Sequence, residues 1–175
     1  MKKQILYVLV AAVAFMTAFN AEALTFNPFK RAGRVRANNL ILTGNYLPSR
    51  LLADVAQYYS KQPILLISRD VDGASQLFYS PSTNSNATPV SADDFMTIVE
   101  YVNPKRIVVL GGDDFVQKEF IDLARSKYSV LILDSDDWNR NAVTLGDLLK
   151  ADKLAISYKQ FLKDYEAVEN NSQKN

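Results

Sequence analysis

The 175-residue chain contains no cysteine and no histidine. These two absences exclude disulfide bonds, thiolate nucleophiles, zinc sites of the usual kind and Ser-His-Asp triads. Lysine and arginine total 20 and aspartate and glutamate total 19, so the chain also lacks the basic excess typical of nucleic-acid-binding proteins. The chemistry that remains must use carboxylates, Lys, Arg, Tyr, Ser or the backbone, and we expect a non-catalytic protein without a cofactor.

Glycine and proline are also scarce, with six of each, whereas hydrophobic residues make up 48% of the chain. This composition is typical of globular proteins and not of disordered or fibrous ones. The length fits one domain of ordinary size.

Residues 1–23 have the pattern of a targeting segment. A short basic start precedes an apolar run of about 15 residues (Ile5–Phe19), which is shorter than a helix that spans a bilayer. Ala21 and Ala23 are small residues at the positions that signal peptidases recognise. We expect a bacterial signal peptide cleaved after Ala23, and thus an exported protein of the periplasm or cell surface with no stable membrane span. A retained membrane anchor is the alternative.

A basic linker is predicted over residues 24–38. Its positive charges come close together, at Lys30, Arg31, Arg34 and Arg36. Such a cluster contacts anionic lipid or polymer in some proteins, and a solvated tether is the other interpretation.

Residues 39–150 alternate apolar runs with segments of helical periodicity. The apolar runs are Leu40–Thr43, Ile64–Ile67, Ile107–Leu110 and Val130–Leu133. The helical segments begin near Pro48, Ser91, Phe115 and Val143. Because apolar runs without polar alternation indicate strands covered on both faces, this pattern predicts an α/β fold. We expect a three-layer, Rossmann-like domain with a mostly parallel sheet of about four strands.

Two segments lie outside this repeat. The connection from Asp70 to Val90 is long and polar, and Gln76–Tyr79 within it has the composition of a short edge strand. Residues 151–169 predict a C-terminal amphipathic helix, whose apolar stripe either packs on the domain or joins another subunit. Residues 170–175 are expected to be a disordered tail.

The ends of the predicted strands carry the candidate ligand-binding residues. In a parallel sheet the carboxyl ends of the strands meet at one edge, where ligands bind. The residues expected there are Thr43, Gly44, Asn45, Tyr46, Arg50, Gly111, Gly112, Asp113, Asp136 and Trp138. The aromatic side chains suit a sugar or peptide ligand, and the arginine suits an anion.

Acidic residues at the same strand ends have two interpretations. Asp113, Asp134 and Asp136 could hold Mg²⁺ or Ca²⁺, which favour carboxylate oxygens, and this is the basis of an alternative function as a phosphoesterase-like, metal-dependent hydrolase. In the favoured interpretation Asp113, and Asp136 or Asp137, cap the helices that follow. The pair Gly111-Gly112 lacks the further glycine and lysine of a phosphate-binding loop, so we expect it to form a tight turn.

The order of the strand ends resembles the cell-wall-binding repeat 2 family. Three segments carry the resemblance: Thr43–Ala53 with its Thr-Gly-Asn-Tyr start, Pro63–Ile67, and Arg106–Gly112 with its valine-rich strand and terminal Gly-Gly. The resemblance covers Leu40 to Leu149 and implies Rossmann-like units that attach surface proteins to anionic wall polymers.

Two departures from the family pattern bear on function. Asp137 stands where the family has arginine, which weakens the argument for an anionic polymer. Family members carry three tandem repeats, whereas this chain has one, so a homotrimer of single copies is one expectation. We therefore expect a non-catalytic cell-envelope protein that binds an envelope polymer or a protein partner through its strand ends.

Overall fold

The computed structural model describes residues 36–69, 72–81 and 86–172, all of which belong to one compact unit. The predicted signal peptide (1–23) and most of the predicted linker (24–38) lie outside the described residues. Within the described part of the chain, no helix combines the length and the apolar character needed to cross a membrane.

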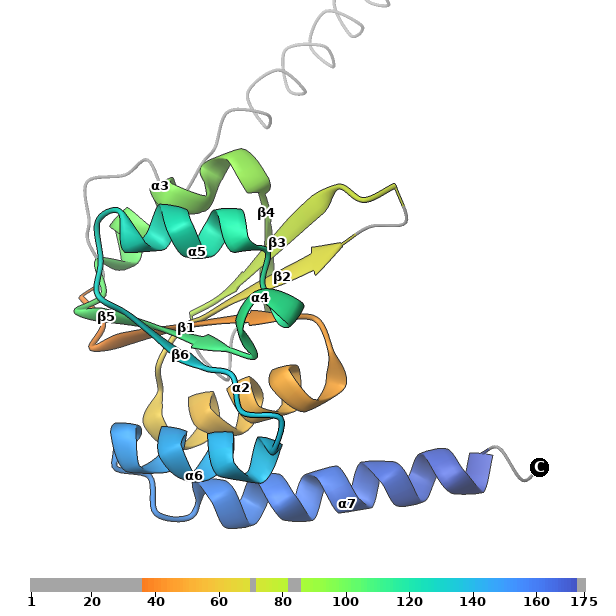
Figure 1. Ribbon diagram of the computed structural model, residues 1–175. Coiled ribbons are helices and arrows are strands. Elements are labelled where there is room, and N and C mark those ends of the chain that lie inside the picture. Colours follow the sequence, from red (N-terminus) through yellow and green to blue (C-terminus); the bar gives the residue numbers. More distant parts are fainter. Residues whose placement is uncertain (1–35, 70–71, 82–85, 173–175) are drawn as a thin grey trace, which may run out of the picture. The chain divides into compact units, whose positions relative to one another are not determined.

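A mixed six-stranded sheet forms the centre of an α/β fold (Figure 1). The strand order is β4-β3-β2-β1-β5-β6. The parallel strands are β1 (Asn39–Gly44), β2 (Ile64–Arg69), β5 (Arg106–Leu110) and β6 (Val130–Leu133). Two further strands, β3 (Ser75–Ser80) and β4 (Thr88–Ser91), are antiparallel to their neighbours.

The prediction of about four strands was therefore incomplete. The four apolar runs are the four parallel strands, but the polar connection after β2 adds a hairpin to the sheet. Leu77 and Tyr79 of β3 are buried and alternate with more exposed neighbours, as in a strand with one covered face. The predicted edge strand Gln76–Tyr79 lies in β3, which is paired on both sides, and β4 is the outermost strand.

Helices cover both faces of the sheet (Figure 1). One face carries α2 (Leu47–Ser60), α6 (Trp138–Leu149) and α7 (Leu154–Ser172). The other face carries α3 (Phe95–Val102), entered through the short 3₁₀ helix η2 (Ala92–Asp94), and α5 (Lys118–Arg125). The single-turn helix α4 (Gly112–Phe115) follows β5 directly.

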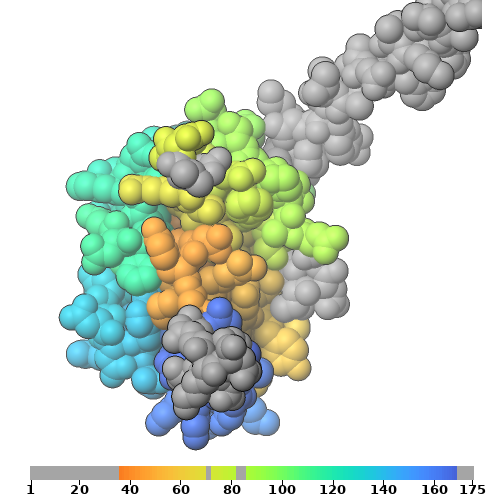
Figure 2. All heavy atoms as spheres, turned by 90° about the vertical axis from the view of Figure 1, so that its right-hand side faces the viewer, coloured from red at the N-terminus to blue at the C-terminus, as the bar shows by residue number. Residues whose placement is uncertain are grey.

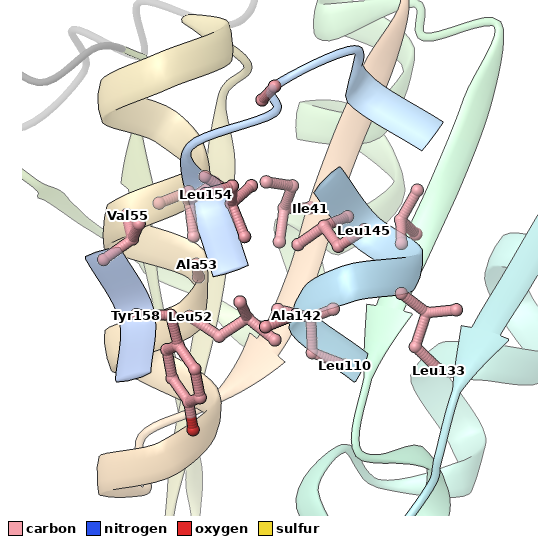
Figure 3. Close-up of a cluster of buried hydrophobic side chains, with 14 residues drawn as sticks. Ile41, Leu52, Ala53, Val55, Leu110, Leu133, Ala142, Leu145, Leu154 and Tyr158 are labelled. Carbon is pink, nitrogen blue, oxygen red and sulfur yellow. The ribbon is translucent and has the colours of Figure 1, made fainter. Parts of the chain in front are cut away.

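The main core lies between the sheet and the helices α2, α6 and α7 (Figure 3). Ile41 and Leu110 enter it from the sheet and Leu52 from α2, each fully or almost fully buried. Tyr158 is the largest of the fully buried side chains and brings the first half of α7 into the same core. Burial of these side chains supplies the main favourable free energy of folding.

Two predicted helices differ from the structure. The helix expected over Phe115 to Leu123 is divided into α4 and α5, because Val116 is extended (φ −124°, ψ 123°) and fully buried. The Gln117 side chain at this break accepts a hydrogen bond from the Ser75 hydroxyl at 2.6 Å, which ties it to β3. The C-terminal helix begins at Leu154 and continues to Ser172, three residues beyond its predicted end.

Candidate functional site

At the centre of the sheet the order of the strands reverses, because β2 lies on one side of β1 whereas β5 and β6 lie on the other. The neighbouring strands β1 and β5 are followed by helices on opposite faces, α2 after β1 and α4 and α5 after β5 (Figure 1). In open α/β sheets a ligand crevice lies outside the carboxyl ends of two such strands. We call this edge, made of Gly44–Tyr46, Gly111–Phe115 and Asp134–Trp138, the strand-end site. Figure 2 views the molecule from this side, with the orange segment after β1 near the centre.

Three aromatic side chains form a continuous row across the strand-end site. The ring of Phe115 lies 5.4 Å from the Tyr46 ring and 5.0 Å from the Trp138 ring, both in edge-to-face geometry. Tyr46 is 49% exposed, and Phe115 and Trp138 are half-buried. Tyr46 lies in the turn after β1, Phe115 in α4 after β5, and Trp138 at the start of α6 after β6, so the row connects the ends of three parallel strands.

Small residues at the strand ends make room for Phe115. A Cβ atom at Gly44 would collide with the Phe115 carbonyl oxygen and lie 2.9 Å from Cδ2 of Tyr46. A Cβ atom at Gly111 would collide with the Phe115 ring. Gly111 (φ 88°) and Gly112 (φ 60°) both have left-handed backbone conformations, which glycine adopts without strain. The interpretation of Gly111-Gly112 as a tight turn from strand to helix is confirmed.

The polar residues after β1 mostly hold the loop in place. Asn45 accepts a hydrogen bond at Oδ1 from Arg50 (3.1 Å) and donates one from Nδ2 to the Ser68 hydroxyl (3.4 Å). Thr43 is fully buried, and its hydroxyl donates to the Gly44 carbonyl at 3.4 Å. Thr43 is therefore not accessible to a ligand, whereas Asn45 and Arg50 are exposed.

The acidic strand ends have separate roles. Asp137 caps α6, because its carboxylate accepts a hydrogen bond from the Asn139 backbone N–H at 2.9 Å. Asp113 lies inside the first turn of α4 and makes no cap, since Gly111 occupies the N-cap position. Asp136 is exposed beside the α6 cap. The prediction that Asp136 or Asp137 caps α6 is thus confirmed, by Asp137, and the prediction of a cap by Asp113 is wrong.

Metal ligation was the other interpretation of these carboxylates. In the ranges that the structure describes, no group of three or more acidic side chains lies close enough together to hold a metal ion. Asp134 instead lies beside Gly112, because a Cβ atom added at Gly112 would be 3.2 Å from Cβ of Asp134.

The structure brings part of the predicted set together. Gly44, Tyr46, Gly111 and Trp138 surround Phe115, whereas Thr43 is buried below the site. Sequence reasoning missed Phe115 as a site residue, because its apolar character indicated only a helix face.

Sequence reasoning also missed Asn141, which is 2% exposed. Its side chain accepts a hydrogen bond from the Ser135 N–H (3.1 Å) and donates one to the Ser135 carbonyl (2.8 Å). These two bonds hold the loop that leads to Trp138. Its place on the apolar stripe of the predicted helix, four residues before Leu145, is the sequence signal that could have identified it.

Comparisons of the chain with protein-family models, with curated protein sequences and with solved structures found no match.

Proposed function

We propose that this chain is an exported, non-catalytic protein of the cell envelope, and that its Rossmann-like module binds an envelope polymer at the strand-end site. The observation that carries the proposal is the row of Tyr46, Phe115 and Trp138 across the reversal point of the sheet. This is the position at which open α/β sheets bind ligands.

The chemistry of the row suits a polymer that contains sugar rings. Aromatic side chains offer large apolar surfaces that pack against other rings, and Tyr and Trp add a hydrogen-bond donor at one end. Tyr46 presents half of its surface to solvent while its ring is held against Phe115. A row that is already fixed in place loses little conformational freedom on binding, which favours affinity.

Arg50 supplies a cation beside the row. Its guanidinium lies 3.9 Å from the Asp54 carboxylate, and both side chains are more than half exposed. Exposed ion pairs of this kind contribute little stability, so an acidic group of the polymer can replace Asp54 at small cost. The targeting pattern of residues 1–23 and the resemblance to cell-wall-binding repeats support an envelope polymer as the ligand.

Co-sedimentation with purified, insoluble cell-wall material tests this function. The chain from Leu24 onward contains the whole compact unit, and Trp138 as the single tryptophan gives a fluorescence signal within the site. We expect saturable binding that Tyr46→Ala weakens by about tenfold, the order of one lost aromatic contact.

A matched variant separates the site from general surface effects. Leu123→Ala removes a side chain that is 45% exposed on α5, which covers the face of the sheet opposite to α2 (Figure 1). This variant should bind the cell-wall material as the unmodified chain does. Equal binding by Tyr46→Ala, in a variant that melts at the normal temperature, would exclude the strand-end site. Absence of co-sedimentation by the unmodified chain would exclude the polymer and favour a protein partner.

A further inference from the structure

A hollow of about 660 Å³ lies at the edge of the sheet where the parallel strands begin, which we call the amino edge. The amino edge is opposite to the strand-end site, and α6 ends and α7 begins there, at the left of Figure 1. We call the hollow the basic hollow and define it by six of the residues that line it: Asn39, Gln62, Lys105, Arg106, Leu149 and Lys150.

Three cationic side chains line the basic hollow, and no acidic side chain does. Lys105 and Arg106 lie at the start of β5, and Lys150 follows the last residue of α6. The ion pairs among the described residues involve none of these three side chains. The whole chain has 20 basic and 19 acidic residues, so the positive charge of the hollow is a local concentration. Unpaired cations that line one concave surface attract an anion.

Hydrogen bonds hold the Arg106 guanidinium in place. Its Nε donates to Oδ1 of Asn39 at 3.1 Å, and Asn39 is only 6% exposed. The Asn39 N–H donates to Oε1 of Gln62 at 2.8 Å, and Nε2 of Gln62 donates to the Ser60 carbonyl at 2.9 Å. The two terminal nitrogens of Arg106 have no hydrogen-bond partner among the described residues. A guanidinium held in this way offers two donors side by side, the geometry that recognises phosphate and carboxylate groups.

The other charges at the amino edge leave the basic hollow positive. Glu100 and Lys127 form an ion pair at 2.6 Å, and Asp152 is followed by Lys153 in the turn between α6 and α7. Asp147 is exposed on α6 and does not line the hollow. The last carbonyl groups of α2 and α6 also lie at this edge and carry partial negative charge. These carbonyl groups reduce the repulsion among the cations before a ligand binds.

The basic linker leads to the same edge of the sheet. It ends at Asn38, which lines the hollow directly before β1. The linker adds the positive charges of Lys30, Arg31, Arg34 and Arg36 to this end of the domain. A surface that carries many anionic groups can contact the hollow and the linker together, whereas a single small anion cannot.

We propose that the basic hollow binds the phosphate of an anionic phospholipid, so that the amino edge lies on a membrane surface. Arg106 binds the phosphate through its two free nitrogens, and Lys105 and Lys150 lie beside it. Leu148 and Leu149 are half-buried in the wall of the hollow and contact the apolar part of the lipid. A free phosphate ion would use the cations but not this apolar wall. The strand-end site then faces away from the membrane.

Flotation with lipid vesicles tests this proposal on the purified chain from Leu24 onward. We expect binding to vesicles that contain phosphatidylglycerol, no binding to vesicles of phosphatidylcholine alone, and weaker binding as the salt concentration is raised. Each cation near an anionic surface contributes about fivefold to the affinity, so Arg106→Gln should weaken binding by at least this factor. Arg106→Lys keeps the charge but has no paired donors, so it should restore only part of the loss.

A double variant tests the hollow without changing the buried hydrogen bonds. Lys105→Gln with Lys150→Asn removes two exposed charges, and asparagine tolerates the left-handed backbone of Lys150 (φ 55°). This variant should bind about 25-fold more weakly, at fivefold for each charge. The matched control is Arg69→Gln, which removes an exposed arginine from the opposite end of a parallel strand, at the end of β2, and should bind as the unmodified chain does.

Four results would overturn the inference. The first two are equal binding to both kinds of vesicle and a loss in Arg69→Gln as large as that in Arg106→Gln. The third is unchanged binding by the double variant, which would assign vesicle binding to the linker alone. The fourth is binding of inorganic phosphate or of wall polymer at the hollow in a chain that does not bind vesicles. The vesicles contain no polymer, so this outcome does not depend on the proposed function.

Discussion

Replacing Gly44 with alanine tests whether Phe115 is packed directly on the end of β1. The added Cβ would collide with the Phe115 carbonyl oxygen, a backbone atom that cannot move without α4. Gly44 does not have a positive φ, so its alanine variant has no backbone penalty and the effect is steric. Overpacking of this kind lowers the free energy of unfolding by about 1–3 kcal/mol. Because the collision is with a backbone atom, we expect the loss in Gly44→Ala to be near the upper end, about 3 kcal/mol.

Urea unfolding followed by Trp138 fluorescence measures this loss. A slope of about 2 kcal/mol per molar urea converts 3 kcal/mol into a fall of about 1.5 M in the midpoint. The control is Gly73→Ala, because Gly73 has φ 79° and no atom within 4 Å of an added Cβ. That variant has only the conformational cost of a left-handed alanine, roughly 1 kcal/mol. If Gly44→Ala lowers the midpoint no more than Gly73→Ala does, Phe115 is not packed on the end of β1.

Two further variants have defined outcomes. Asp137→Ala removes the α6 cap and should lower the free energy of unfolding by about 1 kcal/mol; a loss no larger than that of Asp136→Ala in thermal melts would refute the cap. Tyr158→Phe should leave stability at pH 7 unchanged or slightly higher, because the buried hydroxyl has no hydrogen-bond partner among the described residues. Burial raises the pKa of Tyr158 to about 12, and the charges of Glu166 and Asp137 add to this. Since the unfolded tyrosine loses its proton near pH 10, unfolding is favoured as the pH rises from 10 to 12, by up to about 2–3 kcal/mol. Urea midpoints measured across this pH range should decline less in Tyr158→Phe, and an identical decline would contradict the raised pKa.

The parallel half of the sheet was predictable because its signal is local. Strands covered on both faces must be apolar throughout, and each of the four runs is such a strand. The β3–β4 hairpin has no comparable signal, since β4 (Thr88–Ser91) is short, contains Pro89 and is mostly exposed at the edge of the sheet. Its place in the sheet depends on pairing with β3.

The strand-end site was predictable in its location but not in its composition. The glycines after β1 and β5 indicate tight turns, and the parallel sheet brings them to one edge. The role of Phe115 depends on the break of the helix at Val116, which turns α4 back over the ends of the strands. That break comes from burial of Val116 and the Ser75–Gln117 hydrogen bond, both of which are contacts between distant segments.

The position of β1 has a consequence for how the chain assembles. Strand β1 comes first in the chain but is one of the two middle strands of the sheet. Ile41 pairs with Ile64 on one side, and Leu40 pairs with Ile107 on the other. The sequence separation of the second pair is nearly three times that of the first. Pairing between distant segments forms slowly, because a long loop must close first. Until β5 arrives, β1 exposes an unpaired apolar edge of the kind that recruits other chains into aggregates. A chain interrupted before Arg106 would keep that edge open permanently, so the emerging polypeptide depends on its later half, or on a chaperone, for protection from self-association.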